Sequence, residues 1–168
     1  MQVSPARPAD HPFIAELTVQ TYVSQGWAPP SYQRELADVA GRAARAQLLV
    51  ARVDDRPVGS VALVLDGDFG EVTASADESA FRMLVVDPAA RGQGVGEALV
   101  TACLQRAEAA GRTAMVLSTD PRMHAAHRLY RRLGFTRLPE RDWSPEPGTD
   151  LLVFHRPLGG PAQRTAGG

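Results

Sequence analysis

Apolar positions recur along this chain with two different periods, which predict helices and strands in a definite order. Helical spacing is found in four segments: residues 12–24, residues 32–45, the stretch from Val95 to a stop at Gly111, and residues 124–133, which Gly134 caps. Short runs rich in β-branched and other apolar residues predict strands over 47–53, 58–65, 81–86, 113–118, 135–137 and 151–156.

The segments between these elements predict turns and loops. Residues 54–57 join two strands as a hairpin, residues 66–79 form an acidic loop of small residues, and the proline-rich stretch 143–148 is expected to be a loop. Hairpin strands followed by strand, helix, strand and helix are typical of an α/β domain with a mixed sheet. We expect one domain over residues 1–158 and a flexible, Gly- and Pro-rich tail over 159–168.

The amino-acid composition excludes several kinds of catalytic and binding site. All 18 members of the Lys+Arg count are arginines, so the chain has no lysine for a Schiff base or for a phosphate-binding P-loop. It also lacks asparagine, and Cys103 is its one cysteine, which excludes an internal disulfide and a cysteine-rich zinc site. The net charge of -1 gives no support to nucleic-acid or membrane binding.

The beginning of the sequence and its cysteine content suggest a cellular location. Prolines, an aspartate and a histidine interrupt residues 1–13, where a signal peptide needs an apolar run, and no stretch approaches membrane-spanning length. Together with a free cysteine, this favours the cytoplasm. No motif fixes the oligomeric state, and a homodimer is left open.

Three glycines alternate with other residues just before the longest predicted helix. Arg91, Gly92, Gln93, Gly94, Val95 and Gly96 follow a strand and open that helix. Glycines allow a close approach of the backbone to a ligand, and the free N–H groups and dipole of a helix N-terminus favour an anion, so this segment predicts a diphosphate site. The alternative is that the glycines serve turn geometry alone. A dinucleotide-binding GxGxxG motif is excluded because it needs glycine where Glu97 stands.

With its flanking segments, this loop resembles the GNAT superfamily of acyl-CoA N-acyltransferases. The resemblance rests on the run from Met83 to Pro88, on Arg91, Gly94 and Gly96 as the Arg/Gln-x-x-Gly-x-Gly/Ala motif, and on Leu129, Tyr130, Gly134 and Phe135. It is close over residues 81–135 and elsewhere extends only to the order of elements. It implies a mixed, mostly antiparallel sheet of roughly seven strands, about four helices and a splayed parallel strand pair at the cofactor cleft.

The resemblance also implies a set of site residues and a reaction. Acetyl-CoA would be the co-substrate, without a metal, and an amine would attack its acetyl group directly. Tyr130 would donate a proton to the departing sulfur; its alternative role is that of a core residue. The residues implied to bind the cofactor are Leu84, Val85 and Val86 through their main chain, Arg91, and Gly92, Gln93, Gly94, Val95, Gly96 and Glu97 through the amides of the glycine loop.

Two positions depart from the family pattern. Many members have an asparagine that binds the cofactor seven residues before the tyrosine, and here that position is Met123, so the contact is missing or replaced. Members that acetylate ribosomal-protein N-termini have a glutamate twelve residues before the tyrosine, and here it is Ser118. A hydroxyl cannot replace a carboxylate as base at neutral pH. The candidates for the base are therefore Glu71, Asp77, Glu78 or a water molecule.

The acidic stretch from Asp66 to Glu78 contains five carboxylates and no arginine, and in the family fold it flanks the acceptor cleft. One hypothesis is that it attracts a cationic amine; the other is an ordinary solvated loop. Most of the arginines after Pro121 are expected on a solvated helix face, although some could reach the 3′-phosphate of the cofactor; they are Arg122, Arg128, Arg131, Arg132, Arg137 and Arg141.

Three other observations, on the tryptophans, the cysteine and the histidines, complete the expectations. Trp27 and Trp143 fall in loops that line the acceptor pocket in this family, or else pack in a partly buried position. Cys103 lies on the inward face of a helix as a structural thiol, and the scattered histidines have no metal-ligand spacing.

The leading hypothesis is an acetyl-CoA-dependent N-acetyltransferase that acts on a small-molecule amine or a protein N-terminus. Two other functions are left open: an acyl-CoA-binding sensor or interaction module without turnover, and a nucleotide-binding domain that uses the same glycines.

Overall fold

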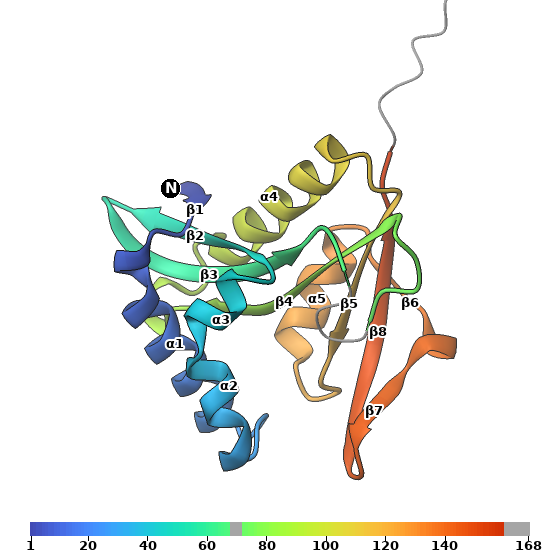
Figure 1. Cartoon of the computed structure of the whole chain (residues 1–168), viewed down its shortest axis with the longest axis horizontal. Coiled ribbons are helices and arrows are strands. Elements are labelled where there is room, and N and C mark those ends of the chain that lie inside the picture. Colours follow the sequence, from blue (N-terminus) through green and yellow to red (C-terminus); the bar gives the residue numbers. More distant parts are fainter. Residues whose placement is uncertain (68–71, 160–168) are drawn as a thin grey trace, which may run out of the picture.

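The computed structural model describes residues 1–67 and 72–159, and over these residues eight strands form a twisted sheet with helices on both faces (Figure 1). The strands are β1 (Gln2–Pro5), β2 (Gln47–Val53), β3 (Arg56–Val64), β4 (Glu78–Val86), β5 (Ala114–Thr119), β6 (Thr136–Arg137), β7 (Trp143–Glu146) and β8 (Thr149–Pro157). The α-helices are α1 (His11–Ser24), α2 (Gln33–Ala37), α3 (Val39–Ala43), α4 (Val95–Ala109) and α5 (His124–Arg132). Single 3-10 turns are η1 (Pro8–Asp10), η2 (Pro30–Tyr32), η3 (Pro88–Ala90) and η4 (Pro139–Arg141).

The strand order confirms the predicted fold class. Seven strands follow the order β1-β2-β3-β4-β5-β8-β6, and β7 pairs with β8 beside this path. Every pairing is antiparallel except that of β4 with β5, which is parallel. The sheet is therefore mixed and mostly antiparallel, with one strand more than expected.

The parallel strands β4 and β5 separate soon after they meet. Their register covers three residue pairs, from Glu78↔Ala114 to Ala80↔Val116. Beyond Ala80, β4 is paired with β3 and β5 with β8. A bulge lies in the separated part of β4, where the register shifts between Ser60 and Ala62 and Met83 has a φ of 53°. Because a bulge increases local twist, it helps to turn β4 away from β5 and leaves main-chain groups of β4 without a strand partner on that side.

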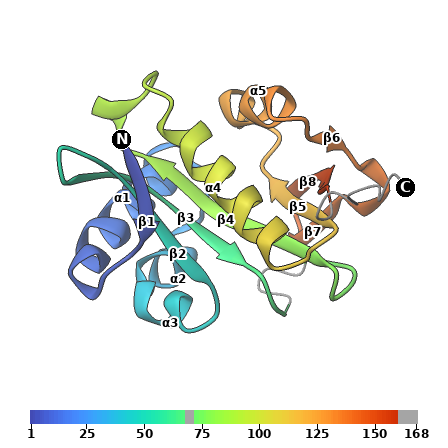
Figure 2. The same ribbon diagram turned by 90° about the horizontal axis from the view of Figure 1, so that it is seen from above.

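The alternation of side chains in β2 divides the core between two faces of the sheet. Leu49 and Ala51 point into the larger cluster under α4, whereas Leu48 and Val50 pack on the other face with Ile14 of α1 and Val39 of α3. In Figure 2, α4 lies along β3 and β4, with which it has contacts. The glycine loop before α4 is thus held on one face, and α1 to α3 lie on the other.

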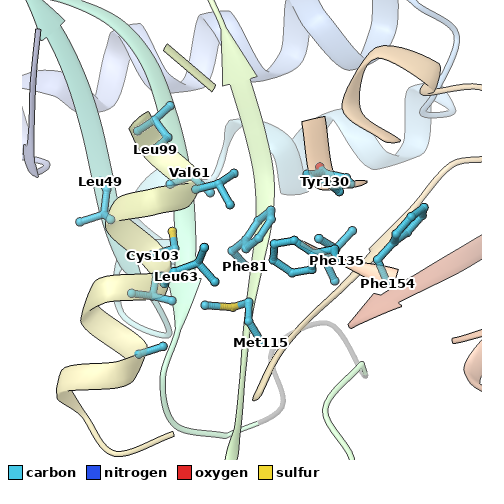
Figure 3. Close-up of a cluster of buried hydrophobic side chains, with 14 of the residues drawn as sticks. Leu49, Val61, Leu63, Phe81, Leu99, Cys103, Met115, Tyr130, Phe135 and Phe154 are labelled. Carbon is cyan, nitrogen blue, oxygen red and sulfur yellow. The ribbon is translucent and has the colours of Figure 1, made fainter. Parts of the chain in front are cut away.

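Side chains from both halves of the sheet meet in the larger cluster. Figure 3 shows Phe81, Tyr130, Phe135 and Phe154 next to one another, with Cys103 of α4 facing Leu63 on the same side of the sheet. Cys103 is fully buried, and burial raises the pKa of its thiol to about 12, which suits the predicted structural role.

Two predicted elements are wrong. The helix expected over 32–45 is interrupted at Asp38 and forms α2 and α3, because the Asp38 carboxylate accepts a hydrogen bond from the Gly41 amide at 2.9 Å and caps a new helix. The loop expected over 143–148 contains β7, which forms a hairpin with β8 through Pro147 and Gly148. Gly148 has a φ of 87°, as the third residue of a type II turn requires.

Other differences concern where elements begin. β4 starts at Glu78 rather than at residue 81, so the end of the predicted acidic loop belongs to the strand that pairs with β5. β1 was not predicted, because four residues that end in proline give a weak strand pattern.

No helix in the described ranges combines the length and apolar character needed to cross a membrane. Of the predicted tail 159–168, all but residue 159 lies outside the described residues.

Candidate active site

The glycine loop has the backbone conformation that its sequence suggested. Gly92 and Gly94 have φ values of 75° and 80°, and Gly94 is the N-cap of α4. A Cβ atom at either glycine would meet nothing within 4 Å, so these glycines are needed for the left-handed backbone and not for space.

The amides of this loop are available to a ligand. None of the backbone N–H groups from Gly92 to Glu97 donates a hydrogen bond to another residue in the described part of the chain. Six such groups at and before the N-terminus of a 15-residue helix are an arrangement typical of anion-binding sites. Arg91 is exposed beside them, and the Glu97 carboxylate is held by Arg132 of α5 at 2.8 Å.

The end of β4, the start of α4 and α5 lie close together. A Cβ atom at Gly96 would be 3.2 Å from Leu129 Cδ2 of α5 and 3.9 Å from Val86 Cγ2 of β4. Glycine therefore allows the first turn of α4 to approach both elements. The residues predicted to bind the cofactor thus gather beside the gap between β4 and β5.

Tyr130 is buried on α5 among other rings. Its ring lies 5.8 Å from Phe81, 6.0 Å from Phe135 and 5.9 Å from Phe154, measured between centroids (Figure 3). Burial raises the pKa of the Tyr130 phenol, and Tyr22 raises it further. Tyr130 is accordingly a protonated hydrogen-bond donor over the whole neutral range.

A pocket of about 620 Å³ lies on the opposite face, between α1–α2 and the β7–β8 hairpin, with residues of β4 and β5 in its lining. Its lining is aromatic: both tryptophans, both tyrosines other than Tyr130, and Phe81 contribute to it. Met83 at the bulge, Ser118 of β5 and Met123 also line it. Trp27 and Trp143 therefore line one pocket and are both partly buried, but Trp143 lies on β7 and not in the expected loop.

Charged groups stand at both sides of this pocket. Asp120 follows β5 and is bound by Arg122 at 2.7 Å, which holds the pKa of its carboxyl below the ordinary range. Arg122 also donates to the Gly26 carbonyl at 3.1 Å, so it connects the turn after β5 with the loop that carries Trp27. On the α2 side, Arg82 donates to the Tyr32 hydroxyl at 2.8 Å.

Met123 takes part in a small polar network at the start of α5. The Thr119 hydroxyl lies 3.4 Å from Met123 Sδ and 3.3 Å from His127 Nε2, and this nitrogen lies 3.1 Å from the Asp120 carbonyl. Burial lowers the pKa of His127, which favours the neutral ring at neutral pH. These contacts fix the turn between β5 and α5, and the Met123 sulfur offers a ligand only a weak acceptor.

The acidic stretch contributes less than the sequence suggested. Glu78 accepts hydrogen bonds from Arg141 at 2.8 and 3.0 Å and from the Ala74 amide at 2.7 Å. Burial would raise the pKa of Glu78, but these bonds hold it below its ordinary value. Asp66 pairs with Arg112, and residues 68–71, including the predicted candidate Glu71, lie outside the described residues. Neither Asp77 nor Glu78 lines the pocket.

Ion pairs within the chain also occupy most of the arginines considered for the 3′-phosphate. Arg122, Arg132, Arg137 and Arg141 each bind a carboxylate, and the Arg131 guanidinium lies 5.7 Å from the centroid of the Phe154 ring. Arg128 is exposed on α5.

Among the pocket residues that sequence reasoning missed are Tyr22, Tyr32 and Asp120. Asp120 had a signal, since it is a carboxylate two residues beyond Ser118, at the end of the strand that leads to the tyrosine helix. Tyr22 and Tyr32 had none, because they reach the pocket only through the packing of α1 against the sheet and of η2 and α2 beside it. No group of three or more His, Cys, Asp or Glu side chains is placed to hold a metal within the described ranges.

Comparison with known proteins identifies relatives over most of the chain. The model of the acetyltransferase (GNAT) family matches residues 12–135. An IAA acetyltransferase of Azospirillum brasilense is 34% identical over 115 residues, which are 67% of this chain and 68% of the relative. A GCN5-related N-acetyltransferase from Kribbella flavida superposes with a TM-score of 0.70 at 28% identity, covering 94% of this chain and 97% of that one. The Salmonella typhimurium protein yncA, whose structure contains its cofactor acetyl-CoA, has a TM-score of 0.70 at 21% identity, covering 99% and 98%.

Proposed function

The chain belongs to the GNAT family of acetyltransferases, and from this premise we propose that it transfers the acetyl group of acetyl-CoA to the amine of a small molecule. The observation that carries the proposal is the gap between β4 and β5. It has a row of unpaired loop amides on one face of the sheet and an aromatic pocket on the other. A thioester that reached the gap from the loop side would meet an amine in the pocket.

The residues beside the gap fit acetyl-CoA. Main-chain groups of Leu84, Val85 and Val86 lack a strand partner on the β5 side and would bind the pantetheine arm. The amides from Gly92 to Glu97 would bind the diphosphate, and Arg91 would add a full positive charge. Met123 would contact the cofactor by packing, because its side chain lacks the amide that an asparagine offers.

The residues of this chain would position the two reactants and assist proton transfer at the amine and at the sulfur. Acetyl-CoA supplies an activated acetyl group, so the N–C bond forms as the C–S bond breaks, and holding the amine near the thioester does most of the work. Tyr130 donates a hydrogen bond to the departing sulfur, and any proton that it passes on is replaced by the second proton that the amine nitrogen loses as the amide forms. The carboxylates that line the pocket attract the protonated amine, whose proton leaves to water; among the described residues they are Glu35, Glu146 and Asp120, of which Asp120 shares its charge with Arg122.

The test is a panel of amines in which CoA release is followed as free thiol. We expect amine-dependent release by the wild-type protein and much slower release by Tyr130→Phe. Asp120→Asn should raise the KM for cationic amines more than it lowers kcat. If acetyl-CoA binds but no amine of the panel promotes release, acetyl transfer is rejected in favour of a non-catalytic acyl-CoA-binding module, which the departures at Met123 and Ser118 leave open.

A further inference from the structure

The side chains of the acceptor pocket indicate the class of amine. We propose that the acceptor is an arylalkylamine, a primary amine attached through a short chain to an aromatic ring, and that Trp27 and Trp143 determine this specificity. The inference rests on the proposed function for its reaction but concerns the pocket alone. It starts from the concentration of rings there: Tyr22, Trp27, Tyr32, Phe81 and Trp143 all line one cavity of about 620 Å³.

The rings come from opposite sides of the cavity. Trp27 follows α1, where its ring makes an edge contact with Tyr22 at 6.1 Å between centroids, and its amide donates to the Tyr22 carbonyl at 2.9 Å. Trp143 lies across the cavity on β7, and its register partner is Leu151 of β8. In Figure 1, α1 and α2 stand on one side of this part of the molecule and β7 on the other. A planar ring between them would find aromatic contacts on both sides.

Within the described residues three carboxylates line the pocket, Glu35, Asp120 and Glu146, and of these Asp120 is the one beside the separated ends of the strands, where the amine end of such a ligand has to lie. Asp120 lines the pocket next to Ser118 and Thr119, at the end of β5 where the strands separate. Arg122 binds the Asp120 carboxylate and the Gly26 carbonyl, so the carboxylate and the Trp27 loop are held together. An ammonium group near Asp120 would therefore lie close to the gap, with its ring directed toward Trp27 and Trp143.

The size of the cavity argues for a small acceptor. A volume of about 620 Å³ is in the range of pockets that enclose drug-sized molecules. Linear aliphatic amines would fill it without using the ring faces, and aromatic pairs contribute beyond the area that they bury. The ring preference should therefore appear in kcat/KM between two amines of equal charge and similar length.

The experiment compares 2-phenylethylamine with hexylamine. We expect kcat/KM to be about tenfold higher for 2-phenylethylamine, and this ratio to fall toward one in Trp27→Leu and Trp143→Leu. Phe13→Leu is the matched control, because Phe13 packs against α3 and β2 outside the pocket and should leave the ratio unchanged.

Binding is measured independently of turnover by tryptophan fluorescence. Both tryptophans of the chain line the pocket, so each single variant leaves the other as a reporter. The emission should change with 2-phenylethylamine at concentrations where hexylamine has little effect.

Equal kcat/KM for the two amines, or a ratio that is unchanged in both tryptophan variants, overturns the inference while acetyl transfer stands. If no amine is acetylated, a fluorescence response selective for 2-phenylethylamine upholds the aromatic specificity and rejects the transferase activity. An unselective response, or none, overturns the inference as well.

Discussion

In the proposed reaction Tyr130 is the proton donor, but its buried surroundings make its phenol a weaker acid than a free tyrosine. Burial raises the pKa of its phenol above the ordinary value of 10.0, whereas the thiol of CoA resembles a cysteine with a pKa near 8.5. Complete proton transfer to a free thiolate is therefore uphill, and Tyr130 acts mainly by a hydrogen bond that strengthens as negative charge develops on sulfur.

For this reason Tyr130→Phe should lower kcat by at most about 10²- to 10⁴-fold and leave the KM for acetyl-CoA little changed. An acid must be protonated to act, and a raised pKa moves the alkaline loss of activity upward. The kcat profile of the wild-type protein should therefore show no decline attributable to Tyr130 below about pH 10. Steady-state kinetics between pH 6 and 10 measure both effects, and an unchanged kcat in the variant would contradict the assignment.

Asp10 and Arg52 form a buried ion pair that does not line the pocket. The two side chains are 10% and 7% exposed and their closest atoms are 2.5 Å apart. Burial by itself would raise the pKa of the Asp10 carboxyl, but hydrogen bonds from the Arg7 amide and from Arg52 hold it below its ordinary value of 3.8. The pair ties η1 to β2 and thereby fixes the start of α1.

Arg52→Met should destabilise the protein by about 3–5 kcal/mol, because it leaves a buried carboxylate without its partner. The double variant Asp10→Asn with Arg52→Met should recover part of this loss. Because the folded pKa of Asp10 is lowered, the contribution of the pair is present above pH 3.8 and is lost as the pH falls through the folded pKa. Urea unfolding at pH 7 and pH 3 checks both statements; a difference between wild type and Arg52→Met that is the same at both pH values would contradict them.

At the scale of elements, α4 offers a matched pair of glycines. Gly94 at its N-terminus and Gly111 after its C-terminus have φ values of 80° and 74°, and a Cβ atom at either would meet nothing within 4 Å. Alanine should therefore strain both positions by about 1–2 kcal/mol. Only Gly94 adjoins the loop amides, and the loss of one charge-assisted hydrogen bond corresponds to about tenfold in affinity.

We therefore expect Gly94→Ala and Gly111→Ala to lower the free energy of unfolding by similar amounts, and only Gly94→Ala to weaken CoA binding about tenfold or more. Urea unfolding and titration calorimetry give the two quantities. Equal CoA affinity in the two variants would mean that the loop does not bind the diphosphate.

The helices and strands also show which parts of the structure can be predicted from local sequence. β2, α4, β5 and α5 follow from apolar periodicity and their stop residues, and the glycine loop follows from a short contiguous motif, so sequence was sufficient for both. The break at Asp38 was missed because a single capping hydrogen bond interrupts residues that otherwise favour a helix. Strand β7 was missed because it depends on a Pro-Gly turn within a polar stretch. The pocket was predicted only in part: the resemblance pointed to Trp27 and Trp143, whereas Tyr22, Tyr32 and Asp120 come together with them through packing between segments far apart in the chain.

At the scale of the whole molecule, the sheet consists of two parts with a narrow connection. β1 to β4 form one part and β5 to β8 the other, and three residue pairs at the start of β4 and β5 join them. Packing around Phe81, Tyr130 and Phe154 connects the parts below the gap, and Arg122 bonded to Gly26 connects them at the pocket. A ligand that inserts its main-chain-like pantetheine arm beside β4 would add a further connection.

Acetyl-CoA should therefore stabilise the chain as a whole and protect one strand edge in particular. At about 100 times its Kd we expect a gain of about 2.7 kcal/mol, which corresponds to a rise in Tm of about 5–10 °C for a chain of this size. In hydrogen exchange, amides of residues 83–86 and of the loop 92–97 should both slow. Adenosine 3′,5′-bisphosphate, which lacks the pantetheine arm, is the control and should leave residues 83–86 unprotected. Because β3 already pairs with the other side of β4, unchanged exchange at 83–86 with acetyl-CoA would show that the open edge does not bind the arm.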